Sequence, residues 1–501
     1  MDPDSSPDPW AAVRETHCAT VVLLGDKAYK VKKPVSLGFL DFTERASRRA
    51  ACEREVVLNR RLAPDVYLGV GGLADPDGDT EPAVVMRRMP EHARLSRLLE
   101  RGVDVLAQVT AVARILATFH AGAERGPRID AQGTRDALSA RWDASFTQVR
   151  PHTATMLPVD LLTEIETEVH RFLAGREELF DERIRRGAVV DGHGDLTIDD
   201  IFCLPDGPRL LDCLEFDDTL RHVDRLDDVS FLAMGLEDAG HPELARTLIE
   251  RWAELLGDPA PPALVHHYFA YRAFVRAKVA CLSGAQLDRP APARVTRYAE
   301  MAHAHLRTAE VVLVIVGGPP GTGKTTLSTQ IAERLGMVLI SSDRVRKEAA
   351  GIDPHTPAPA GFGEGIYSPG HTRATYATML HRAELLLRRG ESVVLDASWN
   401  DPVERERVGG VADTVTARLV ELRCTLDAVT AAARIAGRTG ISDADEHIAA
   451  RIRQNVTPWP SSIGIDMGRA PEDCADEACA MVRPGRLPRP FLRRRPGAGS
   501  Q

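Results

Sequence analysis

The feature that most restricts the fold of this chain is a glycine-rich loop well past its middle. An apolar run, Val311-Val312-Leu313-Val314-Ile315-Val316, precedes the loop, and Leu327, Ile331 and Leu335 recur at helical spacing after it. The loop itself reads Gly318-Pro319-Pro320-Gly321-Thr322-Gly323-Lys324-Thr325-Thr326. A strand, this spacing and a helix together predict a phosphate-binding loop, because backbone N–H groups converge on phosphates at the helix N-terminus.

The two residues that close this loop have the chemistry that a nucleotide needs. Lys324 is predicted to reach the β- and γ-phosphates, and the hydroxyl of Thr325 is predicted to hold Mg2+. We therefore expect ATP or GTP with Mg2+, ATP being the expected cofactor, and all nine loop residues are candidates for nucleotide binding.

Length and charge limit the rest of the molecule. At roughly 150 residues per domain, 501 residues predict two or three domains. The net charge of −9 argues against a body that coats nucleic acid by bulk electrostatics, although a local basic groove stays possible. The eight cysteines include no Cys-x-x-Cys pair, the N-terminus is acidic and rich in proline, and no apolar run approaches 20 residues. We expect a cytoplasmic protein with reduced thiols and no membrane partner.

The N-terminal half changes along its length from strand patterns to helical patterns. Residues 20–24 and 28–32 flank a Gly25-Asp26 turn as in a hairpin, a helix is expected over residues 52–62, and residues 84–86 predict another strand. Apolar residues then alternate three and four apart over 105–119 and 162–172, which predicts helices. The order is a small β-rich lobe followed by a larger α-rich lobe.

Two acidic loops in this half form a second chemical constellation. Asp195 lies in Asp191-Gly192-His193-Gly194-Asp195, and Asp212 follows the apolar pair Leu210-Leu211. Phosphoryl transfer needs one aspartate to accept the proton of the attacking hydroxyl and a second to hold Mg2+, the roles predicted for Asp195 and Asp212. It also needs a strand lysine held by a helix glutamate, for which Lys30 and Glu55 are candidates. Lys32 faces the same side of its strand as Lys30, so it stays an alternative.

Residues ~10 to ~285 resemble the aminoglycoside phosphotransferase and kinase-like fold, on the strength of His193-Gly194-Asp195, Asp212 and the earlier lysine and glutamate. The remainder resembles small-molecule and polynucleotide kinases with a P-loop. The resemblance implies a bilobal α+β domain followed by a parallel α/β sheet with a lid. As domains we predict residues 1–285 (kinase-like), 286–310 (linker helix), 311–485 (P-loop kinase) and 486–501 (disordered basic tail).

The N-terminal half departs from the pattern of that family at two positions. The family usually has His two residues after the catalytic aspartate and Asn five residues after it, where this chain has Thr197 and Asp200. Asp200 can bind metal but cannot donate a hydrogen bond when ionised, and it is expected to repel Asp195 and raise the pKa of one of the two. The site is therefore either active or degenerate. Asp224 and Asp228 resemble the structural aspartate that braces the catalytic loop.

In the C-terminal half, residues 337–340 predict a second strand that ends in Ser341-Ser342-Asp343. Ligands of an open α/β sheet bind at the carboxyl ends of its strands, so Asp343 is the predicted general base, with N-capping of the next helix as the alternative. By resemblance to sugar-acid and polynucleotide kinases, Arg346 or Arg344 holds the substrate.

A third predicted strand, residues 393–396, ends in Asp396, a candidate ligand for Mg2+ or its water. Arg434 and Arg438, four apart on a predicted helix, resemble lid arginines that close over ATP, since the planar guanidinium binds phosphate oxygens bidentately.

These observations favour a bifunctional ATP-dependent phosphotransferase with two nucleotide sites, acting on a small-molecule hydroxyl. Two other functions stay open. In the first alternative, the C-terminal half is a nucleic-acid 5′-hydroxyl kinase. In the second, the chain is a nucleotide-sensing regulatory protein whose N-terminal kinase is degenerate. The acceptor and the oligomeric state do not follow from the sequence.

Overall fold

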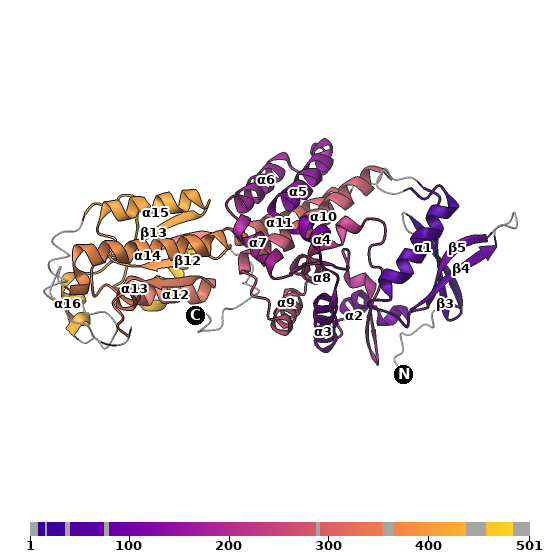
Figure 1. The fold of residues 1–501 in the computed structure, drawn as a ribbon, viewed down its shortest axis with the longest axis horizontal. Helices are drawn as coiled ribbons and strands as arrows, with labels where there is room; N and C mark the ends of the chain where they lie inside the picture. Colours follow the sequence, from indigo (N-terminus) through magenta and orange to yellow (C-terminus); the bar gives the residue numbers. More distant parts are fainter. Residues whose placement is uncertain are drawn as a thin grey trace. The chain divides into compact units, whose positions relative to one another are not determined.

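The computed structural model describes residues 9–15, 18–35, 41–74, 80–286, 291–353, 356, 365–436 and 457–483, and Figure 1 traces them in chain order. They form two compact units: residues 1–138 with 183–259, and residues 139–182 with 260–501. The division falls inside α5 (Arg135–Val149) and α7 (Glu177–Arg185). The four segments predicted from the sequence were divided by resemblance to known folds, whereas these units are divided by contacts within the structure. The predicted boundaries stay a prediction. The predicted tail, residues 486–501, lies outside the described residues.

The first unit contains a five-stranded antiparallel sheet in the order β1-β2-β3-β5-β4. The predicted hairpin is present as β2 and β3, with Val21 opposite Lys30, and α1 packs on the sheet through Cys52 and Val56. The helix predicted over residues 52–62 begins seven residues earlier, at Arg45. Glu44 before it makes no side-chain cap, so no capping signal marked this start in the sequence. The bounds are β1 (Ala11–Glu15), β2 (Ala19–Leu24), β3 (Lys27–Lys32), α1 (Arg45–Asn59), β4 (Tyr67–Ala74) and β5 (Thr80–Arg87).

The rest of the first unit is mainly helical and carries two short strand pairs that hold the acidic loops. β6 pairs with β9, and β7 pairs with β8, both antiparallel. The bounds are α2 (Leu95–Glu100), α3 (Leu106–Gly122), α4 (Pro127–Asp130), β6 (Val189–Asp191), β7 (Ile201–Leu204), β8 (Gly207–Leu210), β9 (His222–Asp224), α8 (Arg225–Asp238) and α9 (Pro242–Leu256).

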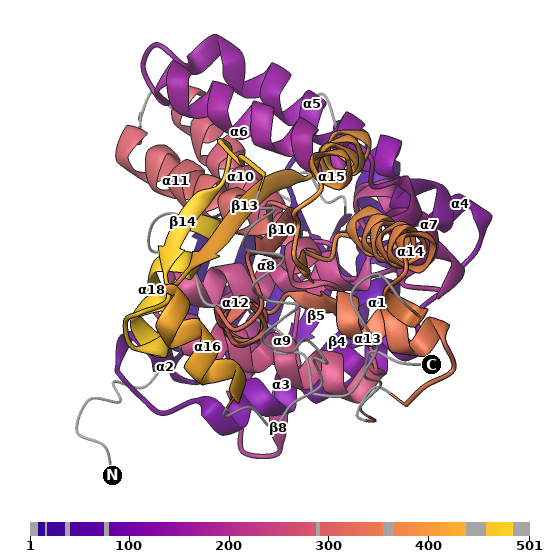
Figure 2. The ribbon, with the colours of Figure 1, turned by 90° about the vertical axis from the view of Figure 1, so that its left-hand side faces the viewer.

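The second unit combines a helical part with a parallel sheet in the order β11-β12-β10-β13-β14. Every residue of β10 is buried, as expected for a central strand covered on both faces. α12 and α18 share one core beneath the sheet, and α14 and α15 lie on its other side (Figure 2). The helical part comprises α6 (Val159–Leu173), α10 (Pro262–Gln286) and α11 (Pro292–Ala309) together with α5 and α7. The sheet part comprises β10 (Val312–Gly317), α12 (Lys324–Leu335), β11 (Val338–Ser341), α13 (Ser342–Ala349), α14 (Pro369–Arg388), β12 (Val393–Asp396), α15 (Pro402–Thr414), β13 (Arg418–Thr425), α16 (Ala428–Ala436), β14 (Ile463–Asp466) and α18 (Pro471–Val482).

The predicted strands and linker helix are therefore present. Most strand ends lie within one residue of the prediction, whereas β5 begins four residues before residue 84 and α11 begins six residues after residue 286. No helix among the described residues is long and apolar enough to cross a membrane.

Candidate active sites

The predicted phosphate-binding loop joins β10 to α12, and its glycines fit its conformation. Gly318, Gly321 and Gly323 have φ values of 133°, 81° and 92°, where other residues are strained. A Cβ on Gly318 would lie 2.6 Å from the carbonyl oxygen of Cys424, and a Cβ on Gly321 would lie 2.6 Å from that of Ala431. The backbone can therefore take this path only with glycine, which leaves its N–H groups available to an anion.

The polar side chains of the loop are arranged around it as the sequence predicts for a nucleotide site. The amino group of Lys324 donates to the carbonyl oxygen of Pro319 at 3.0 Å, and the hydroxyl of Thr325 donates to the Oδ2 of Asp396 at 2.8 Å. Asp396 is buried at the end of β12, the strand beside β10. A loop cradle, a lysine and a hydroxyl–carboxylate pair fit ATP with Mg2+, since Mg2+ in kinases takes one or two protein ligands and the remainder from phosphates and water.

Asp343 lies in the first turn of α13, where Ser341 is the residue at the N-cap position. The alternative that Asp343 caps this helix is therefore wrong, because the helix begins two residues earlier than that reading requires. Asp343 is half-buried and lies two residues after Ser341, the last residue of β11. Ser341 pairs with Asp396 at the end of the neighbouring strand β12. The predicted base and the predicted metal ligand thus lie at the same edge of the sheet.

The structure distinguishes the two arginines predicted to hold substrate. Arg344 is exposed and pairs with Glu348 at 3.2 Å, one turn along the same helix. Arg346 is buried, donates to the carbonyl of Ile366 and the hydroxyl of Thr372 at 3.1 Å each, and lies over the ring of Tyr367. Both roles stay predictions.

Of the two predicted lid arginines, Arg434 lies near the phosphate-binding loop. It donates to the carbonyl of Met467 at 3.1 Å, and a Cβ on Gly323 would lie 3.8 Å from its Nη1. Arg438 and the predicted lid beyond it lie outside the described residues.

In the first unit, the predicted lysine–glutamate pair is part of a larger buried charge cluster. Lys30 lies 3.0 Å from Glu55 and also pairs with Asp212, while Lys32 lies 2.6 Å from Glu55 and pairs with Glu215. Burial works against the charged form of Lys30, but Asp212 and the two glutamates hold its pKa well above the usual value. Desolvation likewise opposes ionisation of Asp212, yet the adjacent Lys30 keeps the pKa of Asp212 below its usual value. Both lysines reach Glu55, so Lys30 is distinguished by its contact with Asp212.

The loop that carries Asp195 is braced from behind by Asp228. Asp228 accepts from the backbone N–H groups of His193 and Gly194 at 2.8 Å each and from the Nε2 of His120 at 2.9 Å. Although burial opposes ionisation, these donors hold the pKa of Asp228 well below its usual range. Asp195 itself is exposed, so the predicted base is accessible. The structural role predicted for Asp228 is confirmed, and Asp224 has a similar one, since it caps α8 and pairs with the buried Arg183.

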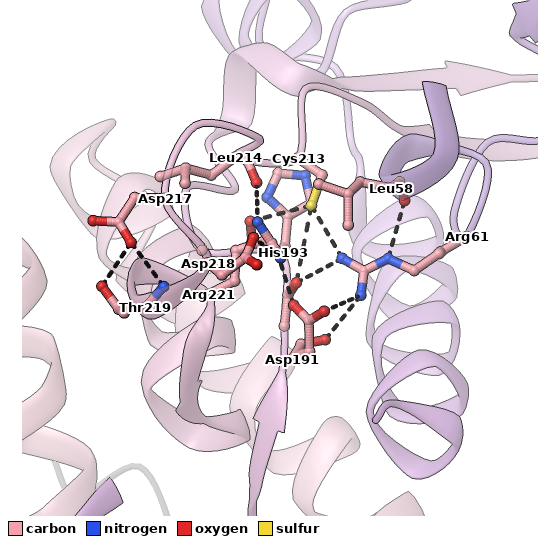
Figure 3. A network of polar contacts seen from close by, with 12 residues as sticks. Leu58, Arg61, Asp191, His193, Cys213, Leu214, Asp217, Asp218, Thr219 and Arg221 are labelled. Atoms are coloured by element: carbon pink, nitrogen blue, oxygen red, sulfur yellow. Dashed lines mark hydrogen bonds and ion pairs between the residues drawn. The ribbon is translucent and has the colours of Figure 1, made fainter. Parts of the chain in front are cut away.

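Arg61 and Arg221 link this loop to the segment after Asp212. Arg61 donates to the carbonyls of Asp191 and Gly192, at 3.0 and 2.9 Å, and to the sulfur of Cys213. Arg221, which Figure 3 shows on the other side of Asp191, bonds the Asp191 carboxylate and the Leu214 carbonyl. The two acidic loops are therefore held together by contacts of the part-buried Arg61 and the buried Arg221, which the sequence did not reveal.

Asp200 is engaged with its own turn. Its Oδ2 accepts from the N–H and the hydroxyl of Thr197, at 3.0 and 2.6 Å, in a reciprocal capping box. Burial first, then the charges of Asp212 and Asp195, raise the pKa of Asp200 well above its usual value. The expected repulsion is present, and Asp200 is the partner that carries it. Within the described residues no group of three or more His, Cys, Asp and Glu side chains is placed to hold a metal ion.

Several residues at these sites were missed in the sequence. Glu215 was visible as an acid two residues after Cys213, but only the fold shows that it meets Lys32. No sequence pattern pointed to Tyr67, yet its hydroxyl accepts a hydrogen bond from the N–H of Asp212 at 3.1 Å. β13 could have been found, because Val420, Leu422 and Cys424 alternate with polar residues at the two-residue strand period.

The fold and these two sites define a chain with a kinase-like N-terminal part and a P-loop kinase-type C-terminal part. Residues 313–459 match the family described as "AAA domain". The chain is 43% identical over 461 residues to "Uncharacterized protein Rv2004c" of Mycobacterium tuberculosis (strain ATCC 25618 / H37Rv) and equally to "Uncharacterized protein Mb2027c" of Mycobacterium bovis (strain ATCC BAA-935 / AF2122/97), covering 92% of this chain and 93% of each relative. The chain belongs to the family of these mycobacterial proteins.

Two solved structures are also similar. A choline/ethanolamine kinase family protein from Mesorhizobium loti is 16% identical, with a TM-score of 0.37, over 62% of this chain and 89% of that one. A gluconokinase from Sinorhizobium meliloti 1021 is 20% identical, with a TM-score of 0.26, over 34% of this chain and 91% of that one.

Proposed function

We propose that this protein is an ATP-dependent phosphotransferase in which the P-loop half transfers the γ-phosphate to a hydroxyl of a small molecule. The observation that carries the proposal is the pair formed by Thr325 and Asp396 at 2.8 Å, beside Lys324 in a loop whose path requires its glycines. When bound, ATP with Mg2+ supplies the transferable phosphate and a metal that offsets its charge.

The residues around the loop have separate roles in this proposal. Lys324 binds the β/γ-phosphates in place of the Pro319 carbonyl, Thr325 and Asp396 position the metal, and Asp343 accepts the proton of the attacking hydroxyl. Arg434 stabilises negative charge beside the loop.

Hydroxyl and aromatic side chains near the same sheet edge support a small polar acceptor. The hydroxyl of Tyr376 lies 3.2 Å from the Oγ of Ser398, two residues beyond Asp396, and its ring packs edge-on against Trp399. Arg344 is engaged by Glu348, which also binds Arg382 at 2.8 Å. This pairing occupies the guanidinium of Arg344, which favours a small molecule over a nucleic-acid end as the acceptor.

A second function is supported for the first unit by the geometry of Asp200. Because its Oδ2 closes a capping box with Thr197, Asp200 is poorly suited to the donor role that the amide of an asparagine has toward the catalytic aspartate. The first unit is then a nucleotide sensor with little transfer. Replacement Asp200→Asn would be expected to raise transfer from this unit, whereas an already active site would lose or keep its rate.

The test combines calorimetry with transfer assays on the full chain. With a non-hydrolysable ATP analogue and Mg2+, we expect two sites in the wild type and one site in each of Lys324→Ala and Asp212→Asn. In a screen of small hydroxylated acceptors, Asp343→Asn should lower kcat by about 10²- to 10⁴-fold, the usual contribution of a general base. Exposed Asp353→Asn, further along the same segment, is the control.

Three results would contradict the proposal in different ways. Unchanged stoichiometry in Lys324→Ala would remove the P-loop site. One site in the wild type that Lys324→Ala abolishes would make the first unit a scaffold. Transfer to oligonucleotide 5′-ends with salt-sensitive binding would replace the small-molecule acceptor with nucleic acid.

A further inference from the structure

A basic cavity lies in the second unit, away from the phosphate-binding loop. It encloses about 180 Å³ and is bordered by α6, α11, the turn between α15 and β13, and the residue after α18. Its charged lining consists of five arginines and two glutamates: Arg171, Arg176, Arg307, Arg418, Arg483, Glu168 and Glu310. The remaining lining includes the apolar Phe172, Leu306 and Val311.

Arg176 is the most unusual member of this cavity because it is fully buried without an acidic partner. Its guanidinium donates to the carbonyls of Val415 and Thr416, and its Nε has no hydrogen-bond partner among the described residues. No carboxylate in the described part of the chain forms an ion pair with it. Burial, together with Arg388 and Arg171, lowers the pKa of Arg176 to about 10, which still leaves it charged at neutral pH.

One carboxylate serves three of the other arginines. Glu310 lies 3.1 Å from Arg171, 2.7 Å from Arg418 and 4.0 Å from Arg483. Glu168 is partly engaged elsewhere, since it lies 3.4 Å from His303. In the lining of the cavity, two carboxylates therefore face five guanidinium groups.

Helix ends reduce this excess but do not remove it. The arginines donate to carbonyls at the C-terminal ends of α15, α18, α11 and α6, through Val415, Val482, Arg307 and Ala174. Each end carries roughly half a negative charge, so four ends offset about two charges of an excess of three. A surplus of about one positive charge faces a half-buried cavity, where screening by water is weak.

We propose that this cavity binds a small multiply charged oxyanion of the size of inorganic phosphate or pyrophosphate, at a site separate from both nucleotide sites. Arginine forks bind phosphate oxygens bidentately, which matches this lining. At about 30 Å³ per water the cavity holds roughly six waters, whereas pockets for larger ligands occupy roughly 300–1,000 Å³. The cavity therefore matches a small anion in size better than it matches a whole nucleotide.

The position of the site decides how it must be tested. β13 begins at Arg418 in this cavity and ends near the phosphate-binding loop, where the carbonyl of Cys424 faces Gly318. Because that loop also binds phosphates, the experiment uses the full chain carrying Lys324→Ala. Chelating Mg2+ removes binding at the first unit, where three carboxylates surround two lysines.

Calorimetric titration of this protein with pyrophosphate should show one site, and adding Arg171→Gln and Arg307→Gln together should weaken it by about 10- to 100-fold. Arg407→Gln, an exposed arginine of α15 that pairs with Glu404 outside the cavity, is the matched control and should leave the affinity unchanged. Arg176 is not substituted, because it holds the end of α15.

Glu310→Gln provides a test of opposite sign, since removing the competing carboxylate should tighten pyrophosphate binding severalfold. A purely structural arginine cluster would not respond in this way. Absence of binding, or binding unaffected by the Arg171 and Arg307 substitutions, would overturn the proposal. Equal weakening by Arg407→Gln would also overturn it, because the effect would then be one of net charge alone.

Discussion

The two candidate active sites are built in different ways. The P-loop site is built from nine successive residues, and the seven other than Pro319 and Pro320 carry backbone N–H groups for the cradle. Asp396 comes from β12 to meet Thr325. The site in the first unit gathers charged side chains from residue 30 to residue 228 and pairs them with one another. The first arrangement is ready for an anion, while the second has its cations already occupied by carboxylates.

This difference assigns different work to a metal in the two sites. In the first unit Lys30 and Lys32 face three carboxylates, Glu55, Asp212 and Glu215, so the cluster is one negative charge in excess. A phosphate approaching it is repelled unless Mg2+ comes with it. The P-loop supplies a helix N-terminus and Lys324 before any metal arrives. We therefore expect nucleotide binding in the first unit to depend on Mg2+ more steeply than in the second.

The strongest test of the paired-charge description is Lys32→Met. Lys32 is fully buried between Glu55 and Glu215, so its loss leaves Lys30 as the one lysine of a cluster with three carboxylates. We expect local stability of β3 and α1 to fall by about 3–5 kcal/mol, measured by native-state hydrogen exchange. Lys33→Met is the matched control, since Lys33 is more exposed and pairs with Glu15, and a change below about 1 kcal/mol is expected there. Equal effects at the two positions would show that the cluster is not under this tension.

The complementary test of the backbone-built site is Gly321→Ala. The new Cβ would lie 2.6 Å from the carbonyl oxygen of Ala431 at a φ of 81°, so the loop must move and misalign its N–H donors. We expect affinity for the ATP analogue to fall by about 100-fold in the second unit and to stay constant in the first. Gly336→Ala at the end of α12 controls for φ alone, because its φ is 65° and nothing lies within 4 Å. Similar losses for both variants would show that strain, rather than the shape of the cradle, decides binding.

The same difference explains how much of each site the sequence could predict. The P-loop, β10, β12 and the pairing of Thr325 with Asp396 follow from local spacing, since neighbouring parallel strands end at one edge of the sheet. In the first unit, motif spacing predicted Asp195, Asp212 and Lys30, and the family resemblance implied the bracing role of Asp228. It could not show that Glu55 is shared by two lysines or that Arg61 and Arg221 join the loops, because those contacts depend on side-chain packing between distant segments.

Asp200→Asn tests the crowding of carboxylates in the first unit through its pH dependence. The raised pKa of Asp200 means that the folded state holds a proton that the unfolded state releases, so its contribution to stability is present below the usual aspartate pKa, roughly 4, and is lost as pH rises. We expect Asp200→Asn to stabilise this unit by about 1 kcal/mol at pH 7 and by progressively less toward pH 4. Hydrogen exchange of residues 191–204 across this pH range is the measurement. A benefit that grows toward low pH would contradict the sign.

Asp228→Asn should have an effect of opposite sign, lowering the stability of this unit at pH 7 and lowering it less as the pH falls. Its depressed pKa gives stability that is present above the usual aspartate pKa and is lost as pH falls. The two substitutions, on carboxylates of the same unit, therefore separate repulsion at Asp200 from hydrogen bonding at Asp228.

The smallest expected effect compares one strained residue from each unit. Asp212 and Thr416 have φ values of 66° and 50°, in the left-handed region that β-branched threonine in particular avoids. Thr416→Gly should stabilise the turn between α15 and β13 by about 0.5–1 kcal/mol, because relief of strain exceeds the added entropy of the unfolded glycine. Asp212→Gly relieves similar strain but removes the carboxylate beside Lys30, so it should abolish Mg2+-dependent nucleotide binding in the first unit. Hydrogen exchange at residues 411–420 and calorimetry measure the two effects. Destabilisation by Thr416→Gly would contradict this expectation and would mean that the threonine side chain holds the turn.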